Sequence, residues 1–322
     1  MLVVAIMSNI SRMVSMQKII SPTKFSMISL IFLLSACTLA PPQAETQLQQ
    51  KQSKFRTLKG LNKDVSIGKI EGQELFINIA LPKKKSKTPR AVMLMLHSHG
   101  VDKYKKDKHN ERLKKFASIG VVAASVSYRW LPEHKFPAGI EDVKATIRFI
   151  KAHAKTLNID PNRIAISGSS KGGYLATMAG VTGNDNSFNK HDLYPEFDSS
   201  VSAVISFSGS LADFTQGKYP EFALLDRFVN SDGRDTKSAL AAISPVTYLD
   251  RNDPPFFIAH GSEDDVVPVG MSRDFVAALN NINHDVNYVE IAGATHHLYG
   301  SQPQKASNAS KASIAFFLLQ TQ

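Results

Sequence analysis

Gly168-Ser169-Ser170-Lys171-Gly172 joins an apolar, β-prone run at 163–167 to a stretch of helical composition at 173–179. A G-x-S-x-G pattern between a strand and a helix is typical of a nucleophile elbow, a sharp turn that exposes a serine. The glycines have no β-carbon, so the backbone can turn tightly there. The helix N-terminus behind the turn favours negative charge near the serine hydroxyl. The stretch therefore predicts a nucleophilic Ser170 at a strand end, with an ordinary Ser/Gly turn as the alternative.

Two downstream segments carry the other side chains that a nucleophilic serine requires. A serine hydroxyl needs a base, and the base needs a carboxylate to orient it. Residues 254–268 read as a buried strand that runs into a polar turn with three consecutive acids. Residues 286–297 read as a β-alternating run followed by small residues and two adjacent histidines. Both groups follow a predicted strand end. Together with Ser170 they give the order serine, acid, histidine, which is the order in hydrolases with a nucleophile elbow.

Several separate motifs resemble those of bacterial α/β-hydrolase esterases of the hormone-sensitive-lipase-like and feruloyl-esterase-like branch. The similar stretches begin near Ala91, and they are Tyr128–Ala138, Glu141-Asp142, Ser244–Tyr248, Pro254-Pro255, His260-Gly261-x-x-Asp264-x-x-Val267-Pro268 and Gly293-Ala294-Thr295-His296. The resemblance implies an α/β-hydrolase fold with a mostly parallel central sheet and helices on both faces. It also implies hydrolysis of carboxylic esters with small or medium acyl groups through an acyl-enzyme intermediate.

The resemblance implies three catalytic roles. Ser170 matches the family's nucleophile, His296 its general base, and Asp264 the carboxylate that orients the imidazole. The motif spacing favours Asp264 over the acids on either side of it, and His296 over the histidine that follows. His260 is expected to be a packed structural histidine at a strand end.

The expected oxyanion hole is where the sequence departs from the family. Relatives commonly carry H-G-G-G after the third strand, whereas this chain has His97-Ser98-His99-Gly100. We expect the backbone N–H groups of Ser98, His99 and Lys171 to receive the oxyanion, because a backbone donor does not depend on side-chain identity. The loss of two glycines restricts the dihedral angles of the loop. Since one donor is worth about 10²–10³ in rate, this loop bears on turnover and substrate class more than on reaction type.

Length and periodicity indicate a single α/β domain after the N-terminal region. The chain has 322 residues, of which 43% are hydrophobic and 20% charged, as in ordinary globular proteins. Apolar runs alternate with segments of helical spacing, which predicts parallel strands joined by helices. The expected strands are 65–70, 74–81, 91–97, 121–128, 163–168, 201–208, 255–261 and 286–291, and the expected helices are 107–119, 140–157, 271–280 and 307–319. Residues 211–242 break the alternation, where either a small cap or an inward-packed helical excursion is expected.

The N-terminus has the proportions of an export signal. A short apolar run at 25–34 follows basic residues, and it is too short to span a bilayer comfortably. It ends in Leu34-Ser35-Ala36-Cys37, which resembles the lipobox of bacterial lipoproteins. The resemblance implies export and a lipid anchor in the cell envelope, at the outer membrane if the source is Gram-negative. The expected division is a signal peptide at 1–36, a flexible tether at 37–55 that starts with the lipidated Cys37, and a catalytic domain at 56–322. An ordinary cleaved signal with a chance cysteine is the alternative.

Charge and composition bear on partners and cofactors. The net charge of +10 falls to +7 without the first 36 residues, which carry three basic and no acidic residues. A solvated basic face is expected, and the chain carries no nucleic-acid motif. No cofactor and no metal is expected, because His296-His297 lacks the flanking ligands that a zinc site needs. Cys37 is the only cysteine, so an internal disulfide is excluded.

Two other functions stay open. Prolyl-oligopeptidase-like peptidases share the elbow and a similar acid turn, although they usually carry a large extra domain for which this chain has no room. A surface lipoprotein that uses the fold only for binding is the other alternative, and the altered loop after His97 is its support.

Overall fold

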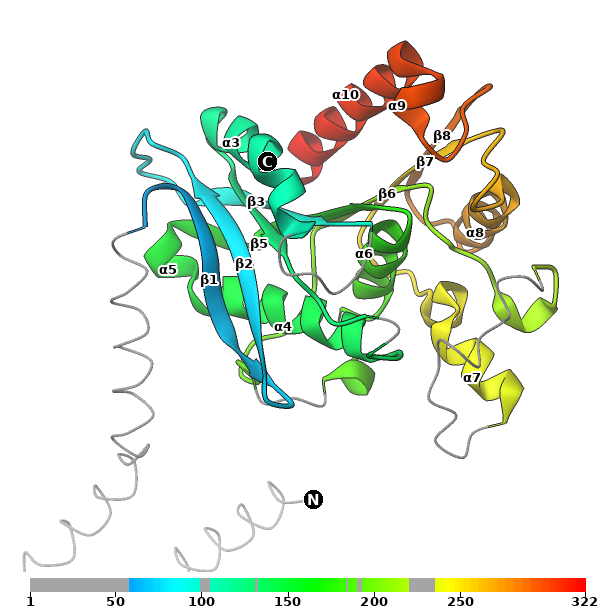
Figure 1. The fold of residues 1–322 in the computed structure, drawn as a ribbon, viewed down its shortest axis with the longest axis horizontal. Coiled ribbons are helices and arrows are strands. Elements are labelled where there is room, and N and C mark those ends of the chain that lie inside the picture. Colours follow the sequence, from blue (N-terminus) through cyan, green and yellow to red (C-terminus); the bar gives the residue numbers. More distant parts are fainter. Residues whose placement is uncertain (1–57, 99–104, 131–132, 184, 190–192, 220–234) are drawn as a thin grey trace, which may run out of the picture. The chain divides into compact units, whose positions relative to one another are not determined.

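One mixed sheet runs through the part of the chain that the structure, a computed structural model, describes: residues 58–98, 105–130, 133–183, 185–189, 193–219 and 235–322 (Figure 1). Its eight strands lie in the order β1-β2-β4-β3-β5-β6-β7-β8. β1 pairs with β2 and β2 with β4 in antiparallel fashion, whereas every later pair is parallel. The strands are β1 (Gly60–Ile70), β2 (Gln73–Leu81), β3 (Arg90–Leu96), β4 (Val122–Val126), β5 (Ile159–Ser169), β6 (Ala203–Phe207), β7 (Phe256–Gly261) and β8 (Val286–Ile291). The expected strands are thus confirmed, with shifted ends.

The central strands are apolar throughout because both faces of the sheet are covered. Successive side chains of a strand point to opposite faces. In β3, Val92, Leu94 and Leu96 join one buried cluster, while Met93 and Met95 join the cluster on the other face. A parallel sheet buried on both faces produces continuous apolar runs of this kind.

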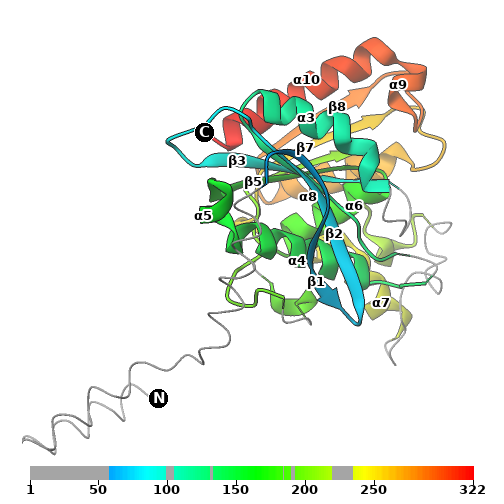
Figure 2. The same cartoon turned by 60° about the vertical axis from the view of Figure 1, so that its left-hand side comes forward.

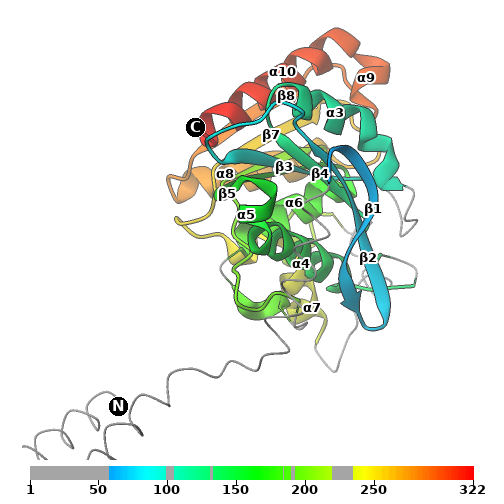
Figure 3. The same cartoon turned by 90° about the vertical axis from the view of Figure 1, so that its left-hand side faces the viewer.

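The helices divide between the two faces of the sheet. Figure 3 shows α3 and α10 on one side and α4, α5 and α6 on the other. Leu113 of α3 and Phe317 of α10 belong to the cluster that contains Met93, whereas Val143 of α4 and Leu175 of α6 belong to the cluster that contains Val92. Burying one such side chain fully stabilises the fold by about 1.5–3 kcal/mol. The helices are η1 (Lys105–His109), α3 (Asn110–Ser118), α4 (Ala138–Ala152), α5 (Ala154–Leu157), α6 (Lys171–Val181), η2 (Asn186–Phe188), η3 (Phe214–Gln216), α7 (Thr236–Ile243), η5 (Pro245–Tyr248), α8 (Val269–Asn281), α9 (Leu298–Ser301) and α10 (Pro303–Gln320).

The antiparallel β1–β2 ribbon bends away from the rest of the sheet. Its register shifts between Asn62 and Val65 and again between Ser66 and Gly68. Such bulges bend a strand and increase its local twist. Figure 2 shows the ribbon curving alongside α4, which it contacts through β1.

Two helices differ from the expectation. The single helix expected at 140–157 is divided into α4 and α5, because the backbone at His153 leaves helical values (φ −101°, ψ 13°). The His153 ring atom Nδ1 lies 2.8 Å from the carbonyl oxygen of Phe149, one turn back. The last helix begins at Pro303 rather than near residue 307, since a proline is well tolerated in the first turn.

The segment at 211–242 is described only in part, because 220–234 lie outside the described residues. Phe214 and Tyr219 are both buried. The Tyr219 hydroxyl donates to Asp274 on α8 at 2.7 Å. These two aromatics pack inward, and the choice between a small cap and a helical excursion stays open for the segment as a whole.

None of the helices that the structure describes is both long enough and apolar enough to cross a lipid bilayer. The predicted signal peptide, the tether and Cys37 all lie outside the described residues.

Candidate active site

Ser170 occupies a strained turn between β5 and α6. Its backbone has φ 54° and ψ −123°, a conformation that costs a non-glycine residue about 1–3 kcal/mol. The Ser170 N–H donates to the carbonyl of Phe207 on β6 at 2.8 Å, which holds the turn in place. A Cβ on Gly168 would come within 2.2 Å of the Gly172 backbone. The two motif glycines therefore permit a turn that larger residues would block, and Ser170 is presented at the carboxyl edge of the sheet.

The chain that leaves β3 runs directly against the first turn of α6. A Cβ on Gly172 would lie 2.7 Å from the carbonyl oxygens of both Leu96 and His97. Ser98 follows at once and is described, whereas His99 lies outside the described residues. The ammonium of Lys171 sits 4.5 Å from the ring centre of Trp130. The chain just before Ser98 therefore packs against the start of α6, next to Ser170 and Lys171. The three-donor oxyanion hole stays a prediction.

Asp264 lies in the turn after β7, with a side chain that is completely buried. Its Oδ1 accepts hydrogen bonds from the backbone N–H groups of Val266 at 3.0 Å and Val267 at 2.7 Å. Burial by itself raises the pKa of this carboxyl, but the hydrogen bonds from His260, His296 and the two backbone N–H groups outweigh it. The pKa of Asp264 is therefore held well below its usual range, and the group is a carboxylate at neutral pH.

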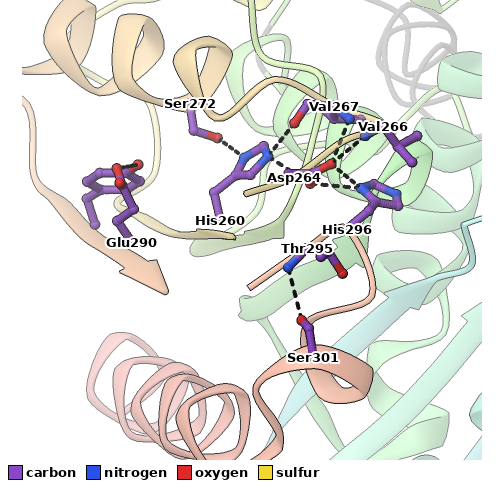
Figure 4. A network of polar contacts seen from close by, with 10 residues as sticks. His260, Asp264, Val266, Val267, Ser272, Glu290, Thr295, His296 and Ser301 are labelled. Atoms are coloured by element: carbon purple, nitrogen blue, oxygen red, sulfur yellow. Dashed lines mark hydrogen bonds and ion pairs between the residues drawn. The ribbon is translucent and has the colours of Figure 1, made fainter. Parts of the chain in front are cut away.

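His296 lies in the loop after β8 and faces Asp264 (Figure 4). Its Nδ1 is 2.8 Å from Oδ2 and 3.0 Å from Oδ1 of the carboxylate. Because a carboxylate only accepts, Nδ1 carries the proton and donates it, and the neutral ring keeps Nε2 as its acceptor. The His296 side chain is 10% exposed, so the ring is largely shielded from solvent, and its contact with Asp264 holds it in one tautomer.

A missing β-carbon lets the histidine loop approach the acid turn. A Cβ on Gly261, the last residue of β7, would lie 2.2 Å from the carbonyl oxygen of Ala294. The N–H of Gly293 donates to the Ser262 hydroxyl at 2.8 Å, and the N–H of Thr295 donates to the Ser301 hydroxyl at 2.9 Å. These contacts hold the loop on both sides of its closest approach to β7.

The structure thus brings some of the expected site residues together. Asp264 contacts His296, whereas the neighbouring Glu263, Asp265 and His297 are exposed. Ser170 follows β5, two strands away from β7 in the sheet order. No hydrogen bond joins its hydroxyl to His296 in the described parts of the chain, and such bonds are often long before substrate binds.

His260 has a contact that the sequence did not reveal. It is fully buried at the end of β7, as expected for a packed residue. Its Nε2, however, lies 3.0 Å from Oδ2 of Asp264. The sequence signal for this contact is the four-residue spacing in the His-Gly-x-x-Asp motif. A tight turn after the strand brings Asp264 back to His260.

Binding of a metal ion requires several ligating side chains close together. Among the described residues, no group of three or more His, Cys, Asp or Glu side chains is arranged to hold a metal ion.

Comparison with known proteins places these features in a family. The family model described as BD-FAE matches residues 77–279. Esterase LipC of Mycobacterium tuberculosis is 36% identical over 190 residues, which make up 57% of this chain and 47% of LipC. LipM of the same organism, a probable carboxylic ester hydrolase, is 35% identical over 199 residues, 60% of this chain and 45% of LipM. The matched region thus spans less than half the length of either relative.

Solved structures agree on the fold. A thermophilic esterase of Thermogutta terrifontis, Est2 with propionate bound, superposes with a TM-score of 0.68 at 24% identity, over 80% of this chain and 94% of that one. This likeness and the eight-stranded, mostly parallel sheet with helices on both faces confirm the expected α/β-hydrolase fold. Because the family match covers more than half of the 322 residues, the chain belongs to the BD-FAE family.

Proposed function

We propose that this chain is a serine hydrolase that cleaves carboxylic esters with small or medium acyl groups. The observation that carries the proposal is the 2.8 Å contact between His296 Nδ1 and the Asp264 carboxylate, on the same edge of the sheet as the strained Ser170 turn. The names of the similar proteins, an esterase and a probable carboxylic ester hydrolase, point to the same reaction.

The reaction would proceed in two halves. Ser170 Oγ attacks the ester carbonyl while His296 Nε2 takes the hydroxyl proton, and Asp264 stabilises the imidazolium that forms. The tetrahedral intermediate collapses, the C–O bond to the alcohol breaks, and His296 returns the proton to the departing alcohol. Water then attacks the acyl-Ser170 ester with His296 again as the base, which releases the acid and restores the serine.

The oxyanion of each tetrahedral intermediate needs donors beside Ser170. The N–H of Lys171 at the start of α6 and the N–H groups of Ser98 and His99 after β3 would supply them. The close approach of Gly172 to the Leu96 and His97 carbonyls supports this assignment, because it draws the chain after β3 against the elbow. Preorganised donors of this kind are often the largest contribution to such catalysis.

A fluorophosphonate probe tests the nucleophile. The probe should label the wild-type protein covalently, and Ser170→Ala should abolish both labelling and hydrolysis of p-nitrophenyl butyrate. Ser169→Ala is the matched control, because this neighbouring serine is exposed and should keep both. A folded wild-type protein that takes no label would contradict the proposal and favour the binding-only lipoprotein. Faster cleavage of amides than of matched esters would favour the peptidase.

We also propose that the enzyme is exported and carries a lipid anchor at Cys37. The lipobox-like Leu34-Ser35-Ala36-Cys37 supports this location, and multiple acyl chains would give stable membrane attachment. Cys37→Ser should move the protein from the membrane to the soluble fraction, and mass spectrometry of the wild-type N-terminus should find acyl groups. An unmodified wild-type Cys37 would contradict the anchor without affecting the proposed reaction.

A further inference from the structure

His260 lies at the centre of a small buried network beside the candidate site (Figure 4). The residue is fully buried. Its Nδ1 is 2.7 Å from the hydroxyl of Ser272 on α8. Its Nε2 is 2.8 Å from the carbonyl oxygen of Val267 and 3.0 Å from Oδ2 of Asp264. Every polar atom of the ring therefore has a partner, and one partner is the predicted catalytic carboxylate.

The chemistry of these partners fixes the direction of the network. A carbonyl oxygen and a carboxylate oxygen can only accept hydrogen bonds, so Nε2 must carry a proton and donate it. In the neutral ring Nδ1 then accepts, and the Ser272 hydroxyl is its donor. The resulting chain runs one way, from Ser272 through His260 to Asp264, and it needs a single tautomer of the ring.

A further charged group beside His260 has partners of its own. Glu290 is its register partner on β8. The Glu290 carboxylate accepts from Arg273 at 2.6 and 2.8 Å and from the Tyr288 hydroxyl at 2.8 Å. The donor on His260 is thus directed to the Val267 carbonyl and to Asp264.

His296 contacts both oxygens of Asp264, and each oxygen also has further partners of its own. Oδ1 accepts from the backbone N–H groups of Val266 and Val267. Oδ2 accepts from His260 and from His296. Without His260, the donor left to Oδ2 among the described residues would be the imidazole that the carboxylate has to orient. A carboxylate anchored at one oxygen can still rotate, whereas one anchored at both presents a fixed edge.

We propose that His260 is a positioning residue that holds Oδ2 of Asp264 in the orientation that His296 needs for proton transfer. It acts through Asp264 and does not touch the reacting atoms. The inference rests on the proposed function, because it requires Asp264 to be the acid of the Ser170–His296 pair.

Two substitutions of matched polarity separate this role from packing. In His260→Asn the side-chain amide ends near the position of Nδ1, so it can reach Ser272 but not Asp264. In His260→Gln the longer side chain brings an N–H near the position of Nε2, where it can donate to Asp264. Ser272→Ala removes a hydrogen bond from the same network while it leaves the donor to Asp264 in place.

The measurements are kcat and KM for p-nitrophenyl butyrate across the pH range, with urea unfolding of every variant. His260→Asn should lower kcat by about 10- to 100-fold, the value of one hydrogen bond to a charged group, and should leave KM nearly unchanged. It should also shift the acid limb of kcat to higher pH, because a carboxylate that has lost one donor attracts the imidazolium proton more strongly. His260→Gln should recover most of the lost kcat, and Ser272→Ala should leave the acid limb where it is in wild type.

Other outcomes would overturn the inference. Equal kcat values for the folded Asn and Gln variants would show that the donor to Asp264 is irrelevant, and so would wild-type kcat in His260→Asn. If His260→Asn does not fold, the other two variants decide. The role is rejected if Ser272→Ala keeps the wild-type kcat and acid limb while folded His260→Gln loses kcat completely, because both variants keep a donor to Asp264. Activity that survives Ser170→Ala would instead refute the proposed function itself, so the two failures are distinguishable.

Discussion

His296 and Asp264 meet across 32 residues of sequence, with 2.8 Å between Nδ1 and Oδ2. Two strand ends and one glycine produce this contact. β7 and β8 are parallel neighbours, so the turns that follow them lie on the same edge of the sheet. Gly261 then allows the backbone of Ala294 to cross closely over the end of β7. The contact is thus a consequence of the topology and of one absent side chain.

Asp264→Asn should lower kcat/KM by about 10⁴-fold, as expected when an amide replaces the acid of a triad and favours the wrong imidazole tautomer. The amide is nearly isosteric, so the fold should be retained. Asp265→Asn is the control, because this neighbouring carboxylate is exposed and should matter little. Steady-state hydrolysis of p-nitrophenyl butyrate measures both. Similar losses in the two variants would show that the acid is misassigned.

The acid limb of the activity profile should reflect a single proton. The pKa of Asp264 is held below its ordinary value of 3.8, since the donors around it outweigh the effect of burial. The carboxylate therefore stays charged across the range in which the enzyme works, and only one group in the pair changes protonation. A plot of log kcat/KM against pH should have a slope of 1 on the acid side, and a slope of 2 between about pH 4 and 7 would contradict the ionised carboxylate.

The same lowered pKa gives a sign to the pH dependence of stability. A carboxyl with a lower pKa in the folded than in the unfolded state stabilises the fold above the unfolded pKa, and this contribution is lost as the pH falls. The difference in unfolding free energy between wild type and Asp264→Asn should therefore be constant above about pH 5 and should change in the direction that disfavours wild type below about pH 4. Urea unfolding at several pH values measures it, and a difference that does not vary with pH would contradict the shift.

Local pattern was sufficient to predict the elements that carry the site. The alternation of apolar runs with helical segments predicts β5, β7 and β8, and the G-x-S-x-G pattern predicts the turn at Ser170, which has φ 54° in the structure. These features depend on residues that are close in sequence. The choice of Asp264 among three consecutive acids came from motif spacing, and that residue is the one in contact with His296.

Contacts made by tertiary packing are harder to predict from local sequence patterns. His260 reads as an apolar-strand residue, and only the folded turn shows that its Nε2 reaches Asp264. The division of the expected helix at His153 is not visible in the sequence, because the apolar spacing continues through this residue. The helix is interrupted there by a change in backbone angles. The geometry between Ser170 and His296 depends on loops from two different strand ends, so the complete triad and its oxyanion donors stay predictions.

Gly261→Ala should uncouple the histidine loop from the acid turn. The added Cβ would meet the Ala294 carbonyl at 2.2 Å, a backbone atom that cannot swing aside. We expect the free energy of unfolding to fall by about 1–3 kcal/mol from overpacking, and kcat to fall further than the folded fraction explains, since His296 is displaced from Asp264. Urea unfolding and steady-state kinetics on the same preparation measure the two effects.

A glycine elsewhere serves as the control for that substitution. A Cβ added at Gly300 in α9 would lie 3.7 Å from the His297 side chain, an ordinary van der Waals distance. Gly300→Ala should therefore leave both stability and kcat close to wild type. Wild-type kinetics in Gly261→Ala would mean that the loop can shift without moving His296.

The buried ion pair between Arg129 and Asp142 is a structural contact whose loss should destabilise the fold strongly. The guanidinium Nη2 lies 2.9 Å from Oδ1, Nε lies 3.0 and 3.1 Å from the two oxygens, and the Arg129 N–H donates to Oδ2 at 2.7 Å. Both side chains are almost fully buried. Burial raises the pKa of Asp142 to about 6 although Arg129 opposes it. The carboxylate is therefore charged at neutral pH only with the help of its partner.

Arg129→Leu should lower the free energy of unfolding by about 3–5 kcal/mol at pH 7, because it leaves a buried carboxylate without its counter-charge.

Without Arg129 the pKa of Asp142 should rise further. A group whose pKa is higher in the folded than in the unfolded state stabilises the fold at low pH, and this contribution to stability is lost as the pH rises. The variant should therefore be less destabilised at pH 5 than at pH 7. The double variant Arg129→Leu/Asp142→Leu should recover part of the loss, since the Asp142 charge is removed with its partner. The recovery should stay partial, because the buried Glu141 carboxylate, 3.5 Å from Arg129, also loses that guanidinium. Lys218→Met, which removes an exposed pair with Asp274, should cost less than about 1 kcal/mol. Additive effects of the two substitutions at 129 and 142 in urea unfolding would show that the pair is not coupled.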